Sequence, residues 1–126
     1  MKLIYYGSTD NGDGKRLQQV IKSVVPVENT EIYRSIEELG NRLRLPTSDV
    51  SVFVLFTKSK TELFDLILIK KWLLDLRILL VLPDGDKETI TMGHTLFPRF
   101  LTYADSDFKD VEAVLKKLIE KEHKGS

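Results

Sequence analysis

The chain contains no cysteine and only two histidines, His94 and His123. The lack of cysteine excludes disulfides, thiol redox chemistry, a cysteine nucleophile and thiolate metal sites. A metal site built on two histidines would need carboxylate ligands arranged around them, and the sequence arranges none. We therefore predict no metal site and no catalytic residue, and we expect a protein that is not an enzyme.

The chain also lacks an excess of charge of either sign and a long apolar run. Lys plus Arg and Asp plus Glu number 19 each among the 126 residues. A neutral domain has no general field to draw nucleic acid or an anionic membrane, so neither is an expected partner. No apolar run reaches about 18 residues without a charge, and the first residues do not resemble a signal peptide. These absences predict a cytoplasmic protein.

Short apolar runs alternate along the chain with helical patterns. Val50–Phe56 and Ile78–Leu82 are nearly continuous apolar runs, which are typical of strands buried on both faces of a parallel sheet. Weaker strand signals lie at residues 3–6, 31–33 and 100–103. Between the strands, apolar residues recur at helical spacing. The helical patterns cover residues 17–24, 36–43, 61–74, 86–96 and 108–119.

Five strands alternating with five helices predict an α/β fold. Parallel neighbouring strands need crossover helices, and these crossovers are nearly always right-handed. We predict a single-domain three-layer αβα sandwich around a five-stranded parallel sheet of order 2-1-3-4-5, which is the flavodoxin-like arrangement. Residues 1–122 form the domain and residues 123–126 a disordered tail. Ser35 and Glu38 have the spacing of a capping box at the start of the second helix.

Ligands of open α/β sheets bind beyond the carboxyl ends of the strands. Four loops are expected at that edge, at 7–14, 57–60, 83–86 and 104–107. The first, Gly7–Gly14, places glycines between a strand and a helix, where backbone N–H groups can cradle phosphate. Its spacing matches neither G-x-x-x-x-G-K-[ST] nor G-x-G-x-x-G. We favour a surface turn, and the alternative is an anion site formed by Ser8, Thr9, Asn11 and Gly12.

Several aspartates are expected to lie near the same edge, namely Asp10, Asp84, Asp86, Asp105 and Asp107. Paired carboxylates can hold Mg²⁺ or exchange protons. Acidic residues are also common at turns and helix starts, where they accept hydrogen bonds from free N–H groups. We favour this second interpretation, so the acids alone do not predict a hydrolase.

The third helical pattern, Thr61–Leu74, has more apolar residues than one buried stripe requires. Leu63, Ile67 and Leu74 fall on one side, whereas Phe64, Leu68 and Trp72 fall toward another. The surplus either packs within the fold or forms an exposed patch that binds a partner or a second copy of the chain. We favour burial, and we expect an exposed helix to produce a dimer that Leu68→Glu dissociates.

The order of elements over nearly the whole chain resembles that of response-regulator receiver domains. Receivers place an acidic pair after the first strand, a phosphoacceptor Asp after the third, a Ser or Thr after the fourth and a Lys after the fifth. By layout, these places hold Gly7-Ser8, Phe56-Thr57, Leu82-Pro83 and Tyr103-Ala104. The resemblance thus implies a degenerate receiver-like domain, or pseudo-receiver, that does not carry out phosphoryl transfer.

Receiver domains commonly bind partners through the fourth helix, fifth strand and fifth helix. By analogy, the interface candidates here are the segment Thr91–Phe97, with Met92, and Tyr103. Leu68 and Trp72 join them if the third helix is exposed. A second and local resemblance concerns Tyr6-Gly7-Ser8-Thr9, which is similar to the start of the flavodoxin phosphate loop.

Together these features predict a non-catalytic signalling or regulatory module that binds a protein, with a homodimer as one form and without a cofactor. The alternative is a small-ligand binder that holds a flavin or nucleotide phosphate at the Gly7–Gly14 loop.

Overall fold

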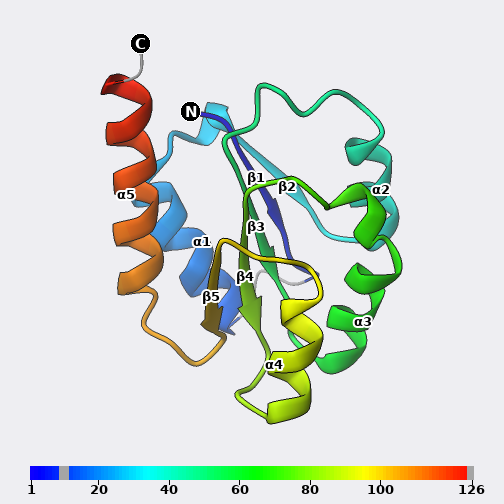
Figure 1. Cartoon of the computed structure of the whole chain (residues 1–126). Coiled ribbons are helices and arrows are strands. Elements are labelled where there is room, and N and C mark those ends of the chain that lie inside the picture. Colours follow the sequence, from blue (N-terminus) through cyan, green and yellow to red (C-terminus); the bar gives the residue numbers. More distant parts are fainter. Residues whose placement is uncertain (9–11, 125–126) are drawn as a thin grey trace.

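The computed structural model describes residues 1–8 and 12–124, and a five-stranded parallel sheet lies at its centre (Figure 1). The strand order is β2-β1-β3-β4-β5, and every neighbouring pair is parallel. This confirms the predicted α/β sandwich and its strand order. The strands are β1 (Leu3–Tyr6), β2 (Thr30–Tyr33), β3 (Val52–Phe56), β4 (Ile78–Leu82) and β5 (Phe100–Tyr103).

Helices cover both faces of the sheet, with α1 and α5 on one face and α2, α3 and α4 on the other (Figure 1). Their bounds are α1 (Gly12–Val24), α2 (Ile36–Leu43), α3 (Lys60–Leu68), α4 (Lys87–His94) and α5 (Lys109–Lys124). Two short 3₁₀ segments, η1 (Val27–Asn29) and η2 (Lys70–Trp72), follow α1 and α3.

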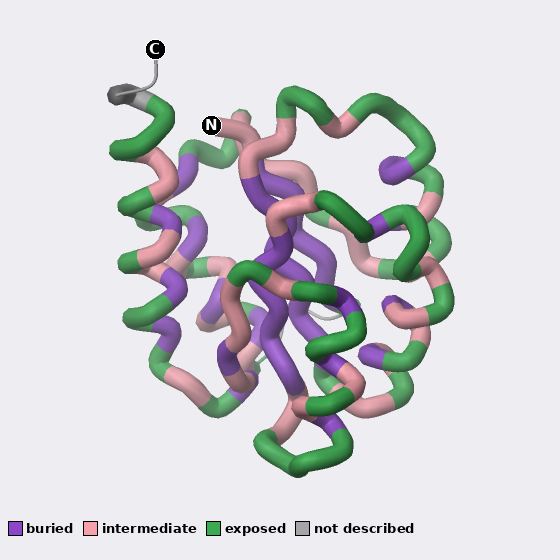
Figure 2. The backbone as a smooth tube through the Cα atoms, viewed as in Figure 1, coloured by how far each residue is buried: buried purple, intermediate pink, exposed green. Residues whose placement is uncertain are grey.

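Strand side chains alternate between two apolar cores. In β1, Leu3 and Tyr5 belong to the core under α1 and α5, whereas Ile4 and Tyr6 belong to the core under α2, α3 and α4. All residues of β3 and β4 are buried, as their continuous apolar runs predict for strands covered on both faces. Figure 2 shows this burial concentrated along the central strands.

The third helix is shorter than predicted, and this is a correction. Periodicity indicated one helix over 61–74, but α3 ends at Leu68 and η2 follows it. The hydrogen bonds tighten there to three-residue steps, from the N–H of Ile69 to the carbonyl of Leu66 and from that of Trp72 to that of Ile69. No glycine or proline marks this end, so the apolar spacing alone overran it.

Two other boundaries differ from the sequence-based ones. The first helix begins at Gly12, inside the segment we had interpreted as a loop. Its first turn holds Asp13, a favourable charge at the positive end of the helix dipole, and Asp13 accepts a 2.8 Å bond from Arg16. At the other end, α5 continues through Lys124, two residues beyond the predicted domain boundary at 122.

Helices α2 and α3 each begin with a serine N-cap. Ser35 Oγ accepts from the Glu38 N–H at 3.1 Å, as predicted, although the Glu38 carboxylate accepts from the Arg34 N–H instead of that of Ser35. The start of α3 repeats this arrangement with Ser59 and Glu62. The cap fixes where α3 starts and thereby which of its residues face outward.

Candidate functional site

The residues that directly follow strands β1, β3, β4 and β5 at the carboxyl edge are Gly7, Thr57, Pro83 and Ala104. A Cβ atom at Gly7 would lie 2.5 Å from the hydroxyl oxygen of Tyr5, a side chain that is fully buried. Thr57 is also fully buried, and its hydroxyl donates a 2.7 Å hydrogen bond to the Val81 carbonyl of β4. The positions after β1 and β3 therefore present no reactive side chain at the edge.

The predicted anion-binding residues are only partly brought together. Thr9 and Asn11 lie outside the described residues. The Ser8 hydroxyl donates a 2.8 Å hydrogen bond to Glu62 of α3, which places a carboxylate beside it. Gly12 begins α1 in the left-handed region, with a φ of 54°. The Ser8–Glu62 contact disfavours a phosphate at this serine, because like charges repel.

Asp84 and Asp107 act as turn and helix-start residues, as we had favoured, whereas Asp86 makes no cap bond and Asp10 lies outside the described residues. Asp84 accepts from the Asp86 N–H at 2.9 Å, and Asp107 accepts from the Lys109 N–H at 3.0 Å. The nearby Thr89 side chain and then the Asp86 N–H lower the pKa of Asp84. Across residues 1–8 and 12–124, no group of three Asp, Glu or His side chains has a geometry suited to a metal ion.

Charge pairs also link the starts of α3 and α4. The Lys60 ammonium lies 3.5 Å from Asp86 and 3.8 Å from Glu88. Nearby, burial and then the charges of Glu62 and Asp65 raise the pKa of Tyr6 to about 12. Tyr6 therefore stays protonated at neutral pH and does not serve as a general base.

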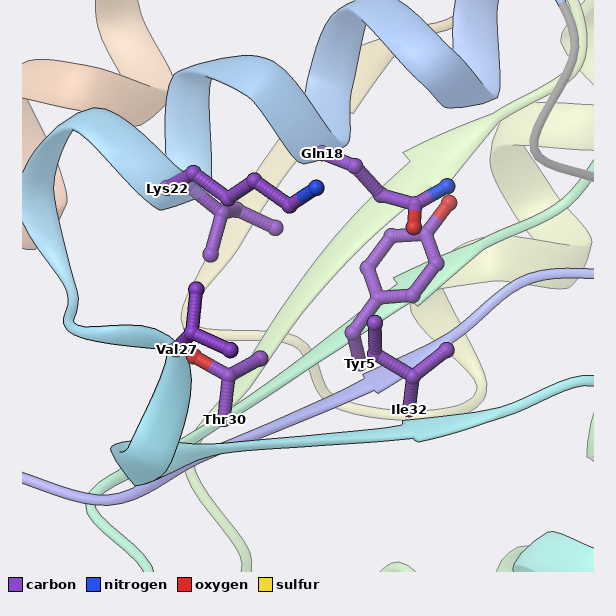
Figure 3. A pocket seen from close by; sticks show the side chains of 7 residues that line it. Tyr5, Gln18, Lys22, Val27, Thr30 and Ile32 are labelled. Carbon is purple, nitrogen blue, oxygen red and sulfur yellow. The ribbon is translucent and has the colours of Figure 1, made fainter.

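A small hollow of about 40 Å³ lies between α1 and β2, away from the carboxyl edge (Figure 3). Its walls are mostly apolar, and Lys22 brings the one charged side chain of the lining. Sequence reasoning did not indicate this hollow, because its walls come from separate elements. It is lined by Tyr5, Gln18, Ile21, Lys22, Val27, Thr30 and Ile32.

A larger open hollow of about 430 Å³ lies at the opposite, amino edge of the sheet. Arg77 and Arg99 line it, but so do Asp75 and Glu122. The two guanidinium groups are thus balanced by two carboxylates, and the hollow has no net charge with which to select an anion.

The outer side of α3 and η2 is exposed, and this corrects the burial that we had favoured. The exposed fractions of Phe64, Leu68 and Trp72 are 51%, 66% and 41%, whereas Leu63, Leu66 and Leu73 are buried. One stripe of a short helix suffices to fill the core, so the second stripe is left in solvent. We call Phe64, Leu68 and Trp72 the α3 face.

The other two predicted interface residues lie outside the α3 face and are not exposed. Met92 of α4 and Tyr103 of β5 are half-buried and pack against the core under α2, α3 and α4. The large apolar side chain that is exposed near them is Phe97, at 74%. The α4–β5 region therefore presents a single exposed ring, in contrast to the three apolar side chains of the α3 face.

The sequence matches no family model, and it matches no curated protein. Among solved structures, the chain is similar to a response regulator from Thermotoga maritima, with a TM-score of 0.64 and 10% identity over 95% of this chain and 98% of that one. It is also similar to a de novo designed Rossmann 2x3 fold protein, with a TM-score of 0.59 and 13% identity over 95% of this chain and 90% of the design. At these identities the similarity shows a receiver-like, flavodoxin-like fold and nothing about the site.

The same fold appears in a response regulator and in a designed protein, so function has to be argued from the side chains. No helix in the described part of the chain is long and apolar enough to cross a membrane.

Proposed function

We propose that this chain is a non-catalytic signalling or regulatory module that binds a protein partner through the α3 face, without phosphoryl transfer. The observation that carries the proposal is the exposure of Phe64, Leu68 and Trp72. They lie within nine residues of each other and expose on the order of 300 Å² of apolar surface, taking large side chains at about 150–250 Å² each. Patches of this size on monomeric proteins are often functional.

The carboxyl edge supports the absence of phosphoryl transfer. Receiver domains use an acidic pair, an Asp, a Ser or Thr and a Lys at the four places that Gly7, Thr57, Pro83 and Ala104 hold here. A side chain at position 7 would have to displace the Tyr5 hydroxyl, and the Thr57 hydroxyl bonds inward to β4. None of these four residues itself carries a carboxylate that could hold Mg²⁺ or accept a phosphoryl group.

Intact-mass measurement after incubation with acetyl phosphate and Mg²⁺ tests this proposal, with an active receiver domain as the positive control. We expect the mass of this chain to stay unchanged while the control gains one phosphoryl group. A phosphoryl adduct on this chain, stable or transient, would refute a phosphorylation-independent module.

Calorimetric titration with FMN and with nucleotides tests the alternative function at the Gly7–Gly14 loop. We expect flat titrations, since Ser8 of that loop is bonded to the Glu62 carboxylate. Micromolar binding that is lost in a Ser8→Ala variant would move the function from the α3 face to this loop.

A further inference from the structure

We infer that the α3 face binds an acidic amphipathic helix of a partner protein. This inference rests on the proposed function, which says only that the face binds a protein. Phe64 and Leu68 lie one helical turn apart on α3, so their side chains form one apolar row. Trp72 extends the row into η2. An apolar row of this kind matches the apolar face of an amphipathic helix.

Two cations lie over the Trp72 ring, and a third, Lys70, stands two residues before Trp72 in η2. The Arg44 guanidinium carbon lies 6.0 Å from the centre of the Trp72 ring, and the Lys71 ammonium nitrogen lies 5.7 Å from it. Lys70 precedes Lys71 in η2, and all three cations are exposed. Within the described part of the chain, no ion pair neutralises any of them, although Lys2, Arg42 and Lys60 are each paired elsewhere.

The acids on the same segment face elsewhere or are already bonded. Glu62 accepts from the Ser8 hydroxyl and the Lys58 N–H, both toward the carboxyl edge. Asp65 is half-buried and acts electrostatically on Tyr6. Asp75 is exposed beyond η2, in the turn toward β4. The cations around Trp72 are therefore available to carboxylates of a partner, and this charge complementarity selects an acidic one.

A second copy and a membrane are the two other occupants to consider. A symmetric contact between two α3 faces would place four unpaired cations, Arg44 and Lys71 of each copy, at one interface, and like charges at an interface oppose association. A helix that lies on a membrane needs a long apolar face and a strongly basic one, whereas α3 has nine residues and the chain is neutral overall.

Trp72 is the only tryptophan of the chain, so its fluorescence reports directly on this face. The experiment titrates the full chain with a synthetic helix-forming peptide that has leucine at i, i+3, i+4 and i+7 and glutamate at the flanking positions. A twin peptide has lysine in place of glutamate. We expect the acidic peptide to shift Trp72 emission to shorter wavelengths and to saturate, with binding that weakens as salt rises, and the basic twin to give no saturable shift.

Three variants sharpen this result, each checked for folding by far-UV circular dichroism. Leu68→Glu should weaken binding of the acidic peptide at least about tenfold. The double variant Arg44→Glu, Lys71→Glu should bind the basic twin in preference to the acidic peptide. Phe97→Ala is the matched control, because this ring is also exposed but lies after α4, and it should leave binding unchanged.

Each of four results would overturn the acidic-helix inference. They are equal binding of the two peptides, no shift with the acidic peptide up to millimolar concentration, a shift with anionic vesicles in place of the peptide, and a dimer in light scattering that Leu68→Glu dissociates. The last result would keep the proposed function with a second copy as the partner. A phosphoryl adduct in the mass measurement would instead remove the proposed function itself.

Discussion

The two helical layers cover the same sheet in different ways. Helices α1 and α5 contain 13 and 16 residues, whereas α2, α3 and α4 contain 8, 9 and 8. Among the described residues, no large apolar side chain of α1 or α5 is exposed, but Phe64 and Leu68 of α3 are. The large apolar residues of the long helices are buried or half-buried, whereas α3 among the short helices leaves apolar side chains exposed. A partner can therefore bind the exposed side chains of α3 without disturbing the packing of the core.

The two layers also differ in how they are attached. The long helices pack through the apolar core that includes Leu17, Phe108 and Leu115. The other layer also packs on an apolar core, and there α2 is in addition joined to β2 by an ion pair, because Arg42 Nε lies 2.8 Å from the Glu31 carboxylate. This difference leads to the following predictions, which are ordered from the largest expected effect to the smallest.

Leucine-to-alanine substitution should separate the two layers most clearly. Leu115 of α5 is fully buried and Leu68 of α3 is 66% exposed. We expect Leu115→Ala to lower the free energy of unfolding by about 2–5 kcal/mol, through lost burial and the cavity that it leaves. Leu68→Ala should change it by less than about 0.5 kcal/mol. Urea unfolding with an unchanged m-value measures both, and similar losses for the two variants would contradict the comparison.

The ion pair between Glu31 of β2 and Arg42 of α2 predicts that the free energy of unfolding depends on pH. Burial alone raises the pKa of Glu31, but hydrogen bonds from Lys2, Tyr33 and Arg42 outweigh it and lower the pKa from 4.5 to about 2. The stabilisation is then complete above about pH 5 and is lost as the pH falls toward about 2, because the unfolded chain takes up the proton first. Glu31→Gln removes this contribution.

Unfolding of the wild type and of Glu31→Gln across this pH range measures the effect. We expect the wild type to lose up to about 3 kcal/mol more than the variant between about pH 6 and pH 2. If the free energy of unfolding changed with pH in the same way for both proteins, the hydrogen bonds to the Glu31 carboxylate would not stabilise the fold.

The glycines of two short helices, Gly93 in α4 and Gly40 in α2, differ in how closely they are packed. A Cβ at Gly93 of α4 would lie 2.9 Å from Leu82 Cδ2 and 3.3 Å from Leu80 Cδ2, both in β4, whereas one at Gly40 of α2 would meet nothing within 4 Å. We expect Gly93→Ala to cost about 1–2 kcal/mol through overpacking. Gly40→Ala should stabilise by about 0.5–1 kcal/mol, because alanine favours helix. Thermal unfolding compares them, and equal signs would mean that α4 is not packed as closely as described.

The smallest predicted effect concerns the electrostatics around Trp72. With Arg44 and Lys71 over its ring, Trp72 fluorescence should be quenched more by iodide than by caesium at equal ionic strength. In the Arg44→Glu, Lys71→Glu variant the order should reverse, while neutral acrylamide quenches both proteins alike. Equal quenching by iodide and caesium in the wild type would show that Arg44 and Lys71 do not lie over the Trp72 ring.

The fold was predictable because its signals are local. The continuous apolar runs of β3 and β4 indicated strands buried on both faces, and Ser35 with Glu38 indicated the start of α2. The end of α3 was not predictable in this way. No breaker stands at Ile69, and the apolar periodicity runs on through Leu73, so the pattern extended the helix past its end.

The candidate site depends on contacts that sequence spacing does not contain. Exposure of Phe64 and Leu68 follows from the fact that Leu63 and Leu66 alone fill the core beneath α3. The closure of the Gly7 position depends on the ring of Tyr5, and the inward hydroxyl of Thr57 depends on a carbonyl of the neighbouring strand. The surplus of apolar residues at 61–74 was the one available signal, and it left burial and exposure open.

The central claim is that this module binds through the α3 face independently of phosphorylation. Its most direct test measures the Trp72 emission titration with the acidic peptide before and after treatment with acetyl phosphate and Mg²⁺, on the same protein sample. We predict superimposable binding curves and an unchanged protein mass. Binding that appears or strengthens only after the treatment, together with a gain of one phosphoryl group, would contradict the account.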